Sequence, residues 1–230
     1  MRVIKGAAMA ASRFIIVDDH TLFRDALRHA LSMSFQSVDI DGAGSFDDLE
    51  VLLKQPKDTE LVLLDLKIPG VQGFSGLLHM RSLHPELPVI VVSATDDPVT
   101  IRRCIDYGAS GFVSKSASVD SIRSAIRAVL DGNVWTPPDF DPNAVSDPED
   151  RALAVRLSSL TPQQIRVLAM LGEGLLNKQI AYKLNVSEAT IKAHVSAILT
   201  KLDVDSRTQA VIAINKGGLN TWSIPGHRDS

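Results

Sequence analysis

The sequence predicts an α/β domain with a doubly wound (βα)5 arrangement, followed by an all-α domain of four helices. Short apolar segments alternate with longer amphipathic segments over the first 130 residues, which is typical of strands and helices around a parallel sheet. A Pro-rich segment follows, and beyond Leu160 only helical periodicity remains. The 230 residues are 45% hydrophobic and 22% charged, so two small domains can each bury a core.

The five expected strands are rich in Val, Ile and Leu, as strands buried on both faces should be. They span residues 13–17, 38–43, 61–64, 88–92 and 111–114, and the helices between and after them span 21–33, 46–54, 73–83, 98–107 and 118–130. We expect residues 1–12 to be a flexible leader and residues 13–131 to form the first domain. A ligand site in such a sheet lies at the carboxyl ends of the strands, near a switch in strand order.

The second half of the chain is expected to hold a linker, a helical domain and a short tail. Residues 132–158 contain four prolines among Asp, Ser and Asn residues, which indicates an exposed linker, with a short helix over 150–157. The helices expected within residues 159–217 span 162–173, 177–184, 188–202 and 206–216, and Gly217-Gly218 stops the last one. Residues 218–230 are the expected flexible tail.

The charge distribution favours a nucleic-acid partner for the helical domain. The formal charge is −2 over residues 1–130, −4 over residues 131–159 and +3 over residues 160–216. A basic C-terminal module can face phosphates even though the whole chain carries −3.

Cysteine usage and hydropathy indicate a soluble protein of the reducing cytoplasm. Cys104 is the only cysteine, which excludes an intramolecular disulfide and a cluster of metal thiolates. No apolar segment approaches the roughly 20 residues needed to cross a bilayer, and the N-terminus lacks the apolar stretch of a signal peptide. We therefore expect no membrane partner.

Acidic residues follow two of the expected strands. Asp18 and Asp19 follow the first strand and Asp65 follows the third, and both strands end at the same edge of the sheet. Three carboxylates in one pocket repel one another unless a cation binds, and hard oxygen ligands suit Mg²⁺. One of the carboxylates can then act as a nucleophile and form an acyl phosphate.

Two further polar residues end expected strands. Ser93 can offer a hydroxyl, and Lys115 an ammonium, to the oxygens of a phosphoryl group. A single Asp or Lys at a strand end is more often a turn former or a solvated charge. Five such groups at the appropriate strand ends together indicate phosphoryl chemistry.

These residues lie in motifs that resemble bacterial receiver domains, over about residues 13–130. The motifs are Val17-Asp18-Asp19-His20, Leu63-Leu64-Asp65-Leu66-Lys67-Ile68-Pro69-Gly70, Val92-Ser93-Ala94 and Lys115. The resemblance implies a flavodoxin-like fold in which Asp65 is the phosphoacceptor. It also implies that Mg²⁺ is held by Asp18, Asp19, Asp65 and the backbone carbonyl of Lys67.

The same resemblance assigns the signalling residues. Ser93 and Lys115 would bind the phosphoryl group, and Phe112 falls where the family has its switch aromatic, a role compatible with packing in the core. The chain departs from many receivers in having Ser116 after the lysine. Lys67 flanks the phosphoacceptor, and we expect it to influence how water attacks the acyl phosphate.

The expected helix over residues 188–202 has the character of a DNA-reading helix. Ser187 is a good N-cap, and the stripe of Ile191, Val195, Ile198 and Leu202 leaves small, polar and basic residues on the opposite face. Such a face can enter the major groove, although periodicity alone fits an ordinary amphipathic helix equally well.

The order of residues here resembles the LuxR-type helix-turn-helix over nearly all of residues 158–216. The matching motifs include Leu160-Thr161-Pro162, Asn177-Lys178-Gln179-Ile180-Ala181, Thr190-Ile191-Lys192-Ala193-His194-Val195 and Arg207-Thr208-Gln209-Ala210. The resemblance implies base contacts by Lys192, Ala193 and Ser196. It implies backbone contact or support by Asn177, Lys178, Ser187, Thr190, His194 and Arg207. For His194, packing is an open alternative.

Together the two domains resemble the NarL/FixJ subfamily of two-component response regulators. This implies that a histidine kinase phosphorylates Asp65, that the face of residues 98–130 rearranges, and that the DNA-binding domain is released or paired. A homodimer would then bind two half-sites of double-stranded DNA. The chain would not be an enzyme beyond its own phosphorylation and dephosphorylation.

Two other functions fit parts of the pattern. A hydrolase with an aspartate nucleophile would be expected to have Asp-x-Asp after the first strand, whereas here the pair is adjacent and the nucleophile follows the third strand. A regulator that uses its receiver only as a protein-interaction module would not need the five phosphorylation groups, all of which are present.

Overall fold

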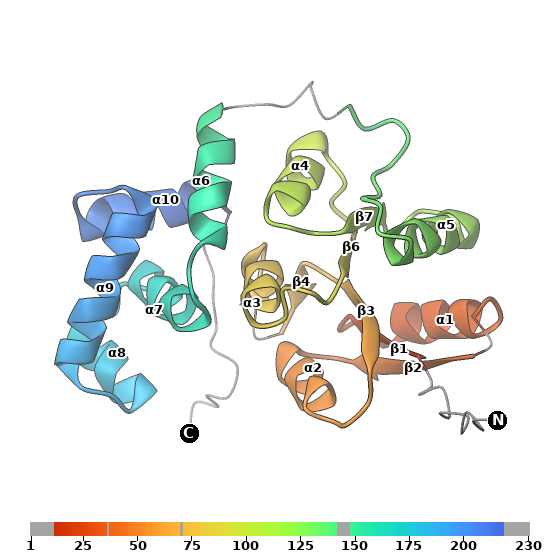
Figure 1. Ribbon diagram of the computed structural model, residues 1–230, viewed down its shortest axis with the longest axis horizontal. Helices are drawn as coiled ribbons and strands as arrows, with labels where there is room; N and C mark the ends of the chain where they lie inside the picture. Colours follow the sequence, from red (N-terminus) through yellow and green to blue (C-terminus); the bar gives the residue numbers. More distant parts are fainter. Residues whose placement is uncertain (1–11, 36, 70, 142–147, 219–230) are drawn as a thin grey trace, which may run out of the picture.

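The N-terminal part of the chain is built around a sheet of five parallel strands in the order β2-β1-β3-β6-β7 (Figure 1). This computed structural model describes residues 12–35, 37–69, 71–141 and 148–218. Most of the expected leader and tail, residues 142–147 of the expected linker, and Gly70 lie outside these ranges. The strands are β1 (Ser12–Val17), β2 (Val38–Ala43), β3 (Thr59–Leu64), β6 (Val89–Ser93) and β7 (Gly111–Ser114).

Helices cover both faces of this sheet (Figure 1). They are α1 (Thr21–Ser32), α2 (Phe46–Leu53), α3 (Ser75–Leu83), α4 (Pro98–Asp106) and α5 (Val119–Leu130). In β1, Phe14 and Ile16 pack in the apolar cluster with α1 and α5, whereas Ile15 and Val17 pack in the cluster with α2, α3 and α4. Successive strand residues point to opposite faces, so the uninterrupted apolar sequence of β1 fits a strand buried on both sides.

The described C-terminal residues are helical, with short connections. The helices are α6 (Pro148–Ser158), α7 (Pro162–Gly172), α8 (Asn177–Leu184), α9 (Glu188–Leu202) and α10 (Arg207–Lys216). Thr161 and Gln164 form a reciprocal capping box at the start of α7. Asn185 closes α8 in the left-handed conformation (φ 53°), which Asn tolerates better than most residues. Throughout the described ranges, no helix is long and apolar enough to span a membrane.

The structure confirms the predicted fold class and adds one short antiparallel hairpin. It consists of β4 (Lys67–Ile68) and β5 (Val71–Gln72) and follows β3. Helix α6 begins at Pro148, two residues before the expected short helix, because proline is tolerated in the first turn, where its missing N–H has no helical partner. Its residues Leu153, Ala154 and Leu157 are buried.

The helical part is docked on the sheet domain. Helices α6 and α7 pack against α3, and α6 also packs against α4, so the apolar cluster on this side of the sheet continues into the helical part. Tyr107, which ends α4, donates a hydrogen bond of 2.9 Å from its hydroxyl to the carbonyl oxygen of Gly217, just after α10. Gly218 lies so close to Phe74 that a Cβ on Gly218 would be 2.9 Å from the ring.

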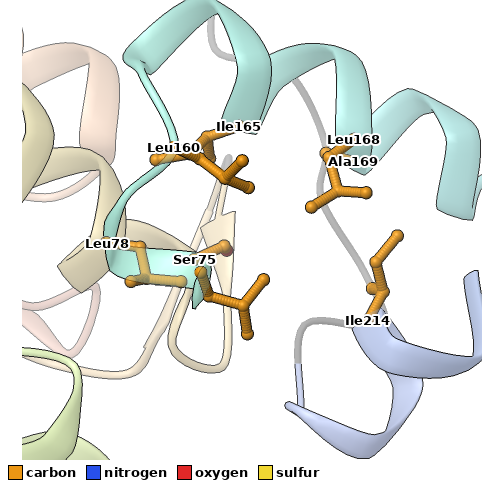
Figure 2. A pocket seen from close by; sticks show the side chains of 8 residues that line it. Ser75, Leu78, Leu160, Ile165, Leu168, Ala169 and Ile214 are labelled. Atoms are coloured by element: carbon orange, nitrogen blue, oxygen red, sulfur yellow. The ribbon is translucent and has the colours of Figure 1, made fainter. Parts of the chain in front are cut away.

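A small cavity remains in this docking interface, between α3 on one side and α7 and α10 on the other (Figure 2). Its volume is about 10 Å³, room for about one water molecule. The lining is almost entirely apolar and comes from both parts of the chain: Ser75, Leu78, Leu157, Leu160, Ile165, Leu168, Ala169 and Ile214.

Candidate functional site

The backbone places the predicted polar residues at one edge of the sheet. The amide of Asp65 donates to the carbonyl of Val17 at 2.9 Å, and the amide of Lys115 donates to the carbonyl of Ser93 at 2.8 Å. These bonds extend the β1–β3 and β6–β7 ladders by one residue beyond the strands. The chain winds outward in opposite directions from β1 and β3, so this edge is the switch point at which doubly wound sheets bind ligands.

The ammonium group of Lys115 bridges two buried carboxylates. Its Nζ lies 2.6 Å from Oδ2 of Asp18 and 2.7 Å from Oδ2 of Asp65, whose side chains are only 2% and 4% exposed. Burial by itself lowers the pKa of Lys115, but the hydrogen bonds and charges of the two carboxylates outweigh it and raise that pKa. The ring of Phe23 lies beneath the ammonium, 5.0 Å from ring centroid to Nζ.

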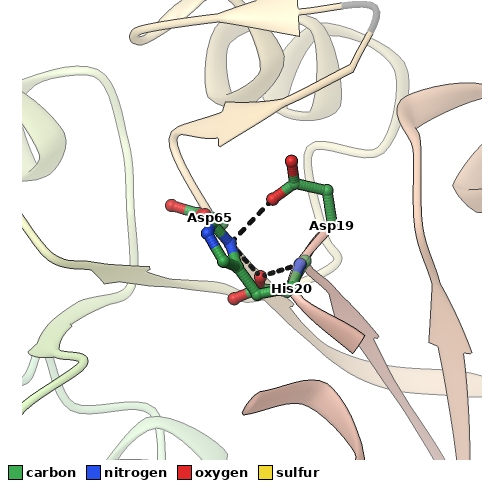
Figure 3. Close-up of side chains that lie close together, drawn as sticks. Asp19, His20 and Asp65 are labelled. Atoms are coloured by element: carbon green, nitrogen blue, oxygen red, sulfur yellow. Dashed lines mark hydrogen bonds and ion pairs between the residues drawn. The ribbon is translucent and has the colours of Figure 1, made fainter. Parts of the chain in front are cut away.

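The acidic residues fit a divalent cation. One ligand atom each from Asp18, Asp19, Asp65 and His20 lies within 4.8 Å of the others (Figure 3). Three carboxylates face one ammonium, so the site carries excess negative charge, and oxygen donors of this kind suit Mg²⁺. The predicted magnesium ligands Asp18, Asp19 and Asp65 are therefore gathered in one pocket.

Ser93, Phe112 and Lys67 take different positions around the pocket. Ser93 is buried, and its Oγ accepts a hydrogen bond of 3.1 Å from the amide of Thr95. Phe112 is fully buried in the apolar cluster that includes α4. The Lys67 side chain is exposed, while its amide donates to Oδ1 of Asp65 at 3.2 Å.

Two residues beside the pocket were not identified from the sequence. The guanidinium of Arg24 donates from Nη1 to the backbone carbonyl of Asp18 at 2.5 Å and so braces the turn after β1. Gly42 makes room for it, since a Cβ there would be 3.1 Å from Cδ of Arg24. The other residue is His20, whose ring contacts the carboxylates. The role of Arg24 could not be predicted from the sequence, because its hydrogen-bond acceptor is a backbone carbonyl and not a side chain.

Helix α9 presents the face expected to read DNA. Ile191, Ile198 and Leu202 are buried against the rest of the domain, and Lys192, Ala193 and Ser196 are exposed. Lys192 pairs with Glu188 one turn earlier at 3.1 Å. The exposed face thus combines small, polar and basic side chains on a rigid helix.

The remaining predicted DNA-contacting residues lie in α8, in α9 or just before it, and at the start of α10. Lys178, Ser187 and Thr190 are exposed, and Asn177, His194 and Arg207 are half-buried. Ser187 caps α9 by accepting a hydrogen bond of 3.1 Å from the amide of Thr190. Arg207 donates from Nη2 to the carbonyl of Leu175 at 2.5 Å, so in this structure it braces the loop before α8.

Comparison with known proteins assigns both parts of the chain. Residues 14–127 match the family model of the response regulator receiver domain, and residues 158–214 match that of the bacterial regulatory proteins of the luxR family. The glycerol metabolism activator of Pseudomonas putida is 39% identical over 207 residues, which cover 87% of this chain and 94% of that protein. The nitrate/nitrite response regulator protein NarP of Escherichia coli is 32% identical over 211 residues, 86% of this chain and 92% of NarP.

Solved structures agree on the fold. The RcsB response regulator of Salmonella typhimurium aligns with a TM-score of 0.53 at 21% identity, covering 90% of this chain and 100% of the RcsB chain. The sheet order, the helical second domain and the sequence relatives all lead to one assignment. The chain belongs to the NarL/FixJ-type two-component response regulators, transcriptional regulators that join a receiver domain to a LuxR-type DNA-binding domain.

Proposed function

We propose that this regulator accepts a phosphoryl group on Asp65 from a sensor histidine kinase in the cytoplasm, and that phosphorylation controls dimerisation and sequence-specific binding to double-stranded DNA. The observation that carries the proposal is the Lys115 bridge: one ammonium holds the buried carboxylates of Asp18 and Asp65 at the switch point of the sheet. A nucleophile, a cation-binding group and a phosphoryl-binding group thus share one pocket.

The transfer uses groups of this pocket, a phosphodonor and the divalent cation that the acidic residues would hold. An oxygen of the Asp65 carboxylate attacks the phosphorus, the bond from phosphorus to the donor's leaving group breaks, and the leaving group keeps the electron pair. The ammonium of Lys115 then binds one phosphoryl oxygen and the hydroxyl of Ser93 donates to another. Mg²⁺, held by Asp18, Asp19, Asp65 and the carbonyl of Lys67, would neutralise charge on the phosphoryl oxygens. Attack by water later releases inorganic phosphate and restores the carboxylate.

Helix α4 connects this chemistry to the DNA-binding domain. When the Ser93 hydroxyl turns toward the phosphoryl group, it loses its hydrogen bond with the amide of Thr95, which lies in the loop before α4. Phe112 packs in the same cluster as α4 and can repack as the helix moves. The end of α4 holds Gly217 through Tyr107, so a shift of α4 weakens the docking of the two domains.

Docking leaves the reading face of α9 open. Lys192, Ala193 and Ser196 are exposed although the domains are in contact. Docking therefore restricts the position of the DNA-binding domain relative to the receiver. It does not cover the recognition helix. A dimer must place two recognition helices about one DNA turn apart, roughly 34 Å, and release from α4 gives each domain the freedom to reach its half-site.

Relatives support this use of the domains. RcsB has been solved as dimers bound to DNA, and bound to a promoter in the presence of the phosphomimetic BeF₃⁻. For this chain we infer that a dimer binds DNA, with Lys192 and Ser196 donating to base edges and Ala193 keeping the helix close to them. Lys192→Ala should weaken specific binding by about 1–3 kcal/mol, and the loss should depend on the operator sequence.

The test is incubation with acetyl phosphate and Mg²⁺, followed by intact mass measurement and DNA binding. We expect one phosphoryl group per chain, tighter DNA binding, and neither effect in Asp65→Asn. Turnover of many equivalents would instead indicate a phosphatase. No incorporation, with DNA binding unchanged, would indicate a receiver that acts only as a protein-interaction module.

A further inference from the structure

His20 adds a nitrogen donor to the acidic pocket (Figure 3). Its Nδ1 lies 2.9 Å from Oδ1 of Asp19 and 3.2 Å from Oδ1 of Asp18. The ring makes no capping hydrogen bond to α1, and the side chain is 69% exposed, so neither helix capping nor core packing explains its position. The imidazole instead faces the carboxylates expected to bind a metal.

The two sides of Asp18 serve different partners. Its Oδ2 pairs with Lys115, while its Oδ1 accepts the backbone amide of His20 at 2.8 Å and also faces the His20 ring. The backbone amide fixes the main chain of His20 beside the pocket whatever side chain it carries. The ring therefore contacts the oxygen of Asp18 that does not pair with the ammonium.

The spacing of the donor atoms suits a single ion. The four ligand atoms of the pocket lie within 4.8 Å of one another, and ligands bound to one ion at about 2.1 Å each are separated by up to about 4.2 Å. Small side-chain movements are enough to bring all four into contact with the same ion. Oxygen donors alone suit Mg²⁺, whereas imidazole favours transition ions such as Co²⁺ and Zn²⁺.

We propose that His20 is a fourth side-chain ligand of this pocket and shifts its preference from Mg²⁺ toward transition ions that bind imidazole. This inference depends on the metal site of the proposed function and adds a ligand and a selectivity to it. The expected consequence is a receiver whose metal content follows the supply of transition ions as well as that of Mg²⁺. The carboxylates alone would give no such preference.

The test measures metal binding directly on the full-length protein. Calorimetric titrations with Co²⁺ and with Mg²⁺, in the same buffer, would compare wild type with His20→Gln. We expect Co²⁺ to bind at least about tenfold more weakly to the variant, and Mg²⁺ within about twofold of wild type. His29→Gln, an exposed histidine in the last turn of α1, is the matched control and should behave as wild type.

Pulsed electron paramagnetic resonance of bound Mn²⁺ identifies the ligand. Wild type and His29→Gln should show coupling to an imidazole nitrogen, and His20→Gln should lack it. Equal weakening of both ions without nitrogen coupling would mean that His20 only orients the carboxylates, and the proposal would be wrong. If Mg²⁺ itself does not bind to wild type, the metal site of the proposed function fails first. Thermal unfolding of the three proteins checks that the exposed substitutions leave the fold intact.

Discussion

Replacing Tyr107 by Phe should loosen the docking of the DNA-binding domain on the receiver. The substitution removes the 2.9 Å hydrogen bond from the buried phenol to the carbonyl of Gly217 and keeps the ring against Phe74, with which it makes an edge-on contact at 5.3 Å. One such bond contributes about 1 kcal/mol, and a buried carbonyl left without its donor costs about as much again. A change of about 1–2 kcal/mol moves the docked-to-free equilibrium by roughly 5- to 30-fold.

The assay is nuclear magnetic resonance relaxation of the unphosphorylated protein, which reports the tumbling of each domain. Docked domains tumble as one body, so wild type should give a single correlation time, whereas Tyr107→Phe should give shorter and separate values for the two domains. Tyr182→Phe changes the other tyrosine, which is 87% exposed on α8, and should behave as wild type. Equal tumbling of the two variants would refute the role of Tyr107 in docking.

Gly218 allows the same interface to be perturbed from the other side. An Ala at Gly218 (φ +71°) would place its Cβ 2.9 Å from the ring of Phe74, whereas at Gly174 (φ +82°) a Cβ meets nothing within 4 Å. Both substitutions carry a similar backbone cost of about 1–2 kcal/mol, because both positions have positive φ. Only Gly218→Ala should separate the domains. If Gly174→Ala separated them as well, the separation would be caused by backbone strain and not by the contact with Phe74.

Three further predictions follow from the site and its helices. Lys115→Gln leaves Asp18 and Asp65 without their ammonium, so urea unfolding should show a loss of roughly 3–5 kcal/mol, partly restored by Mg²⁺. Ser187→Ala removes the cap of α9 and should destabilise the DNA-binding domain by about 1 kcal/mol while acetyl phosphate still phosphorylates the receiver. Burial raises the pKa of Tyr107 to about 12, whereas a free phenol titrates at about 10. Docking should therefore weaken as the pH rises through this range. Once the protein is phosphorylated and the domains separate, tyrosinate absorbance should appear at lower pH.

The sequence predicts the receiver sheet well because its central strands β1, β3 and β6 each contain a run of four apolar residues. The expected and observed limits of β2 and β7 coincide, and those of β1 differ by one residue. The β4–β5 hairpin was missed, because two strands of two residues each carry no periodic pattern. Asp18, Asp65 and Lys115 could be placed together from the sequence, since the rule for doubly wound sheets brings strand ends to one edge.

Contacts between the domains could not be predicted in this way. Tyr107 and Gly217 are 110 residues apart, and the acceptor is a backbone carbonyl. The Gly217-Gly218 pair was interpreted only as a helix stop. In the structure Gly217 has helical φ (−74°) and only Gly218 is left-handed, and Gly218 also permits the close approach to Phe74. A glycine has no side chain whose pattern could indicate such a partner.

The most direct test of phosphoryl transfer to Asp65 is to locate the phosphoryl group. Borohydride reduction of the protein treated with acetyl phosphate and Mg²⁺ converts an aspartyl phosphate to homoserine, which peptide mass spectrometry can place in the sequence. We expect homoserine at position 65 in place of Asp65, and none when Mg²⁺ is withheld. Modification of another residue, or of none, would contradict it.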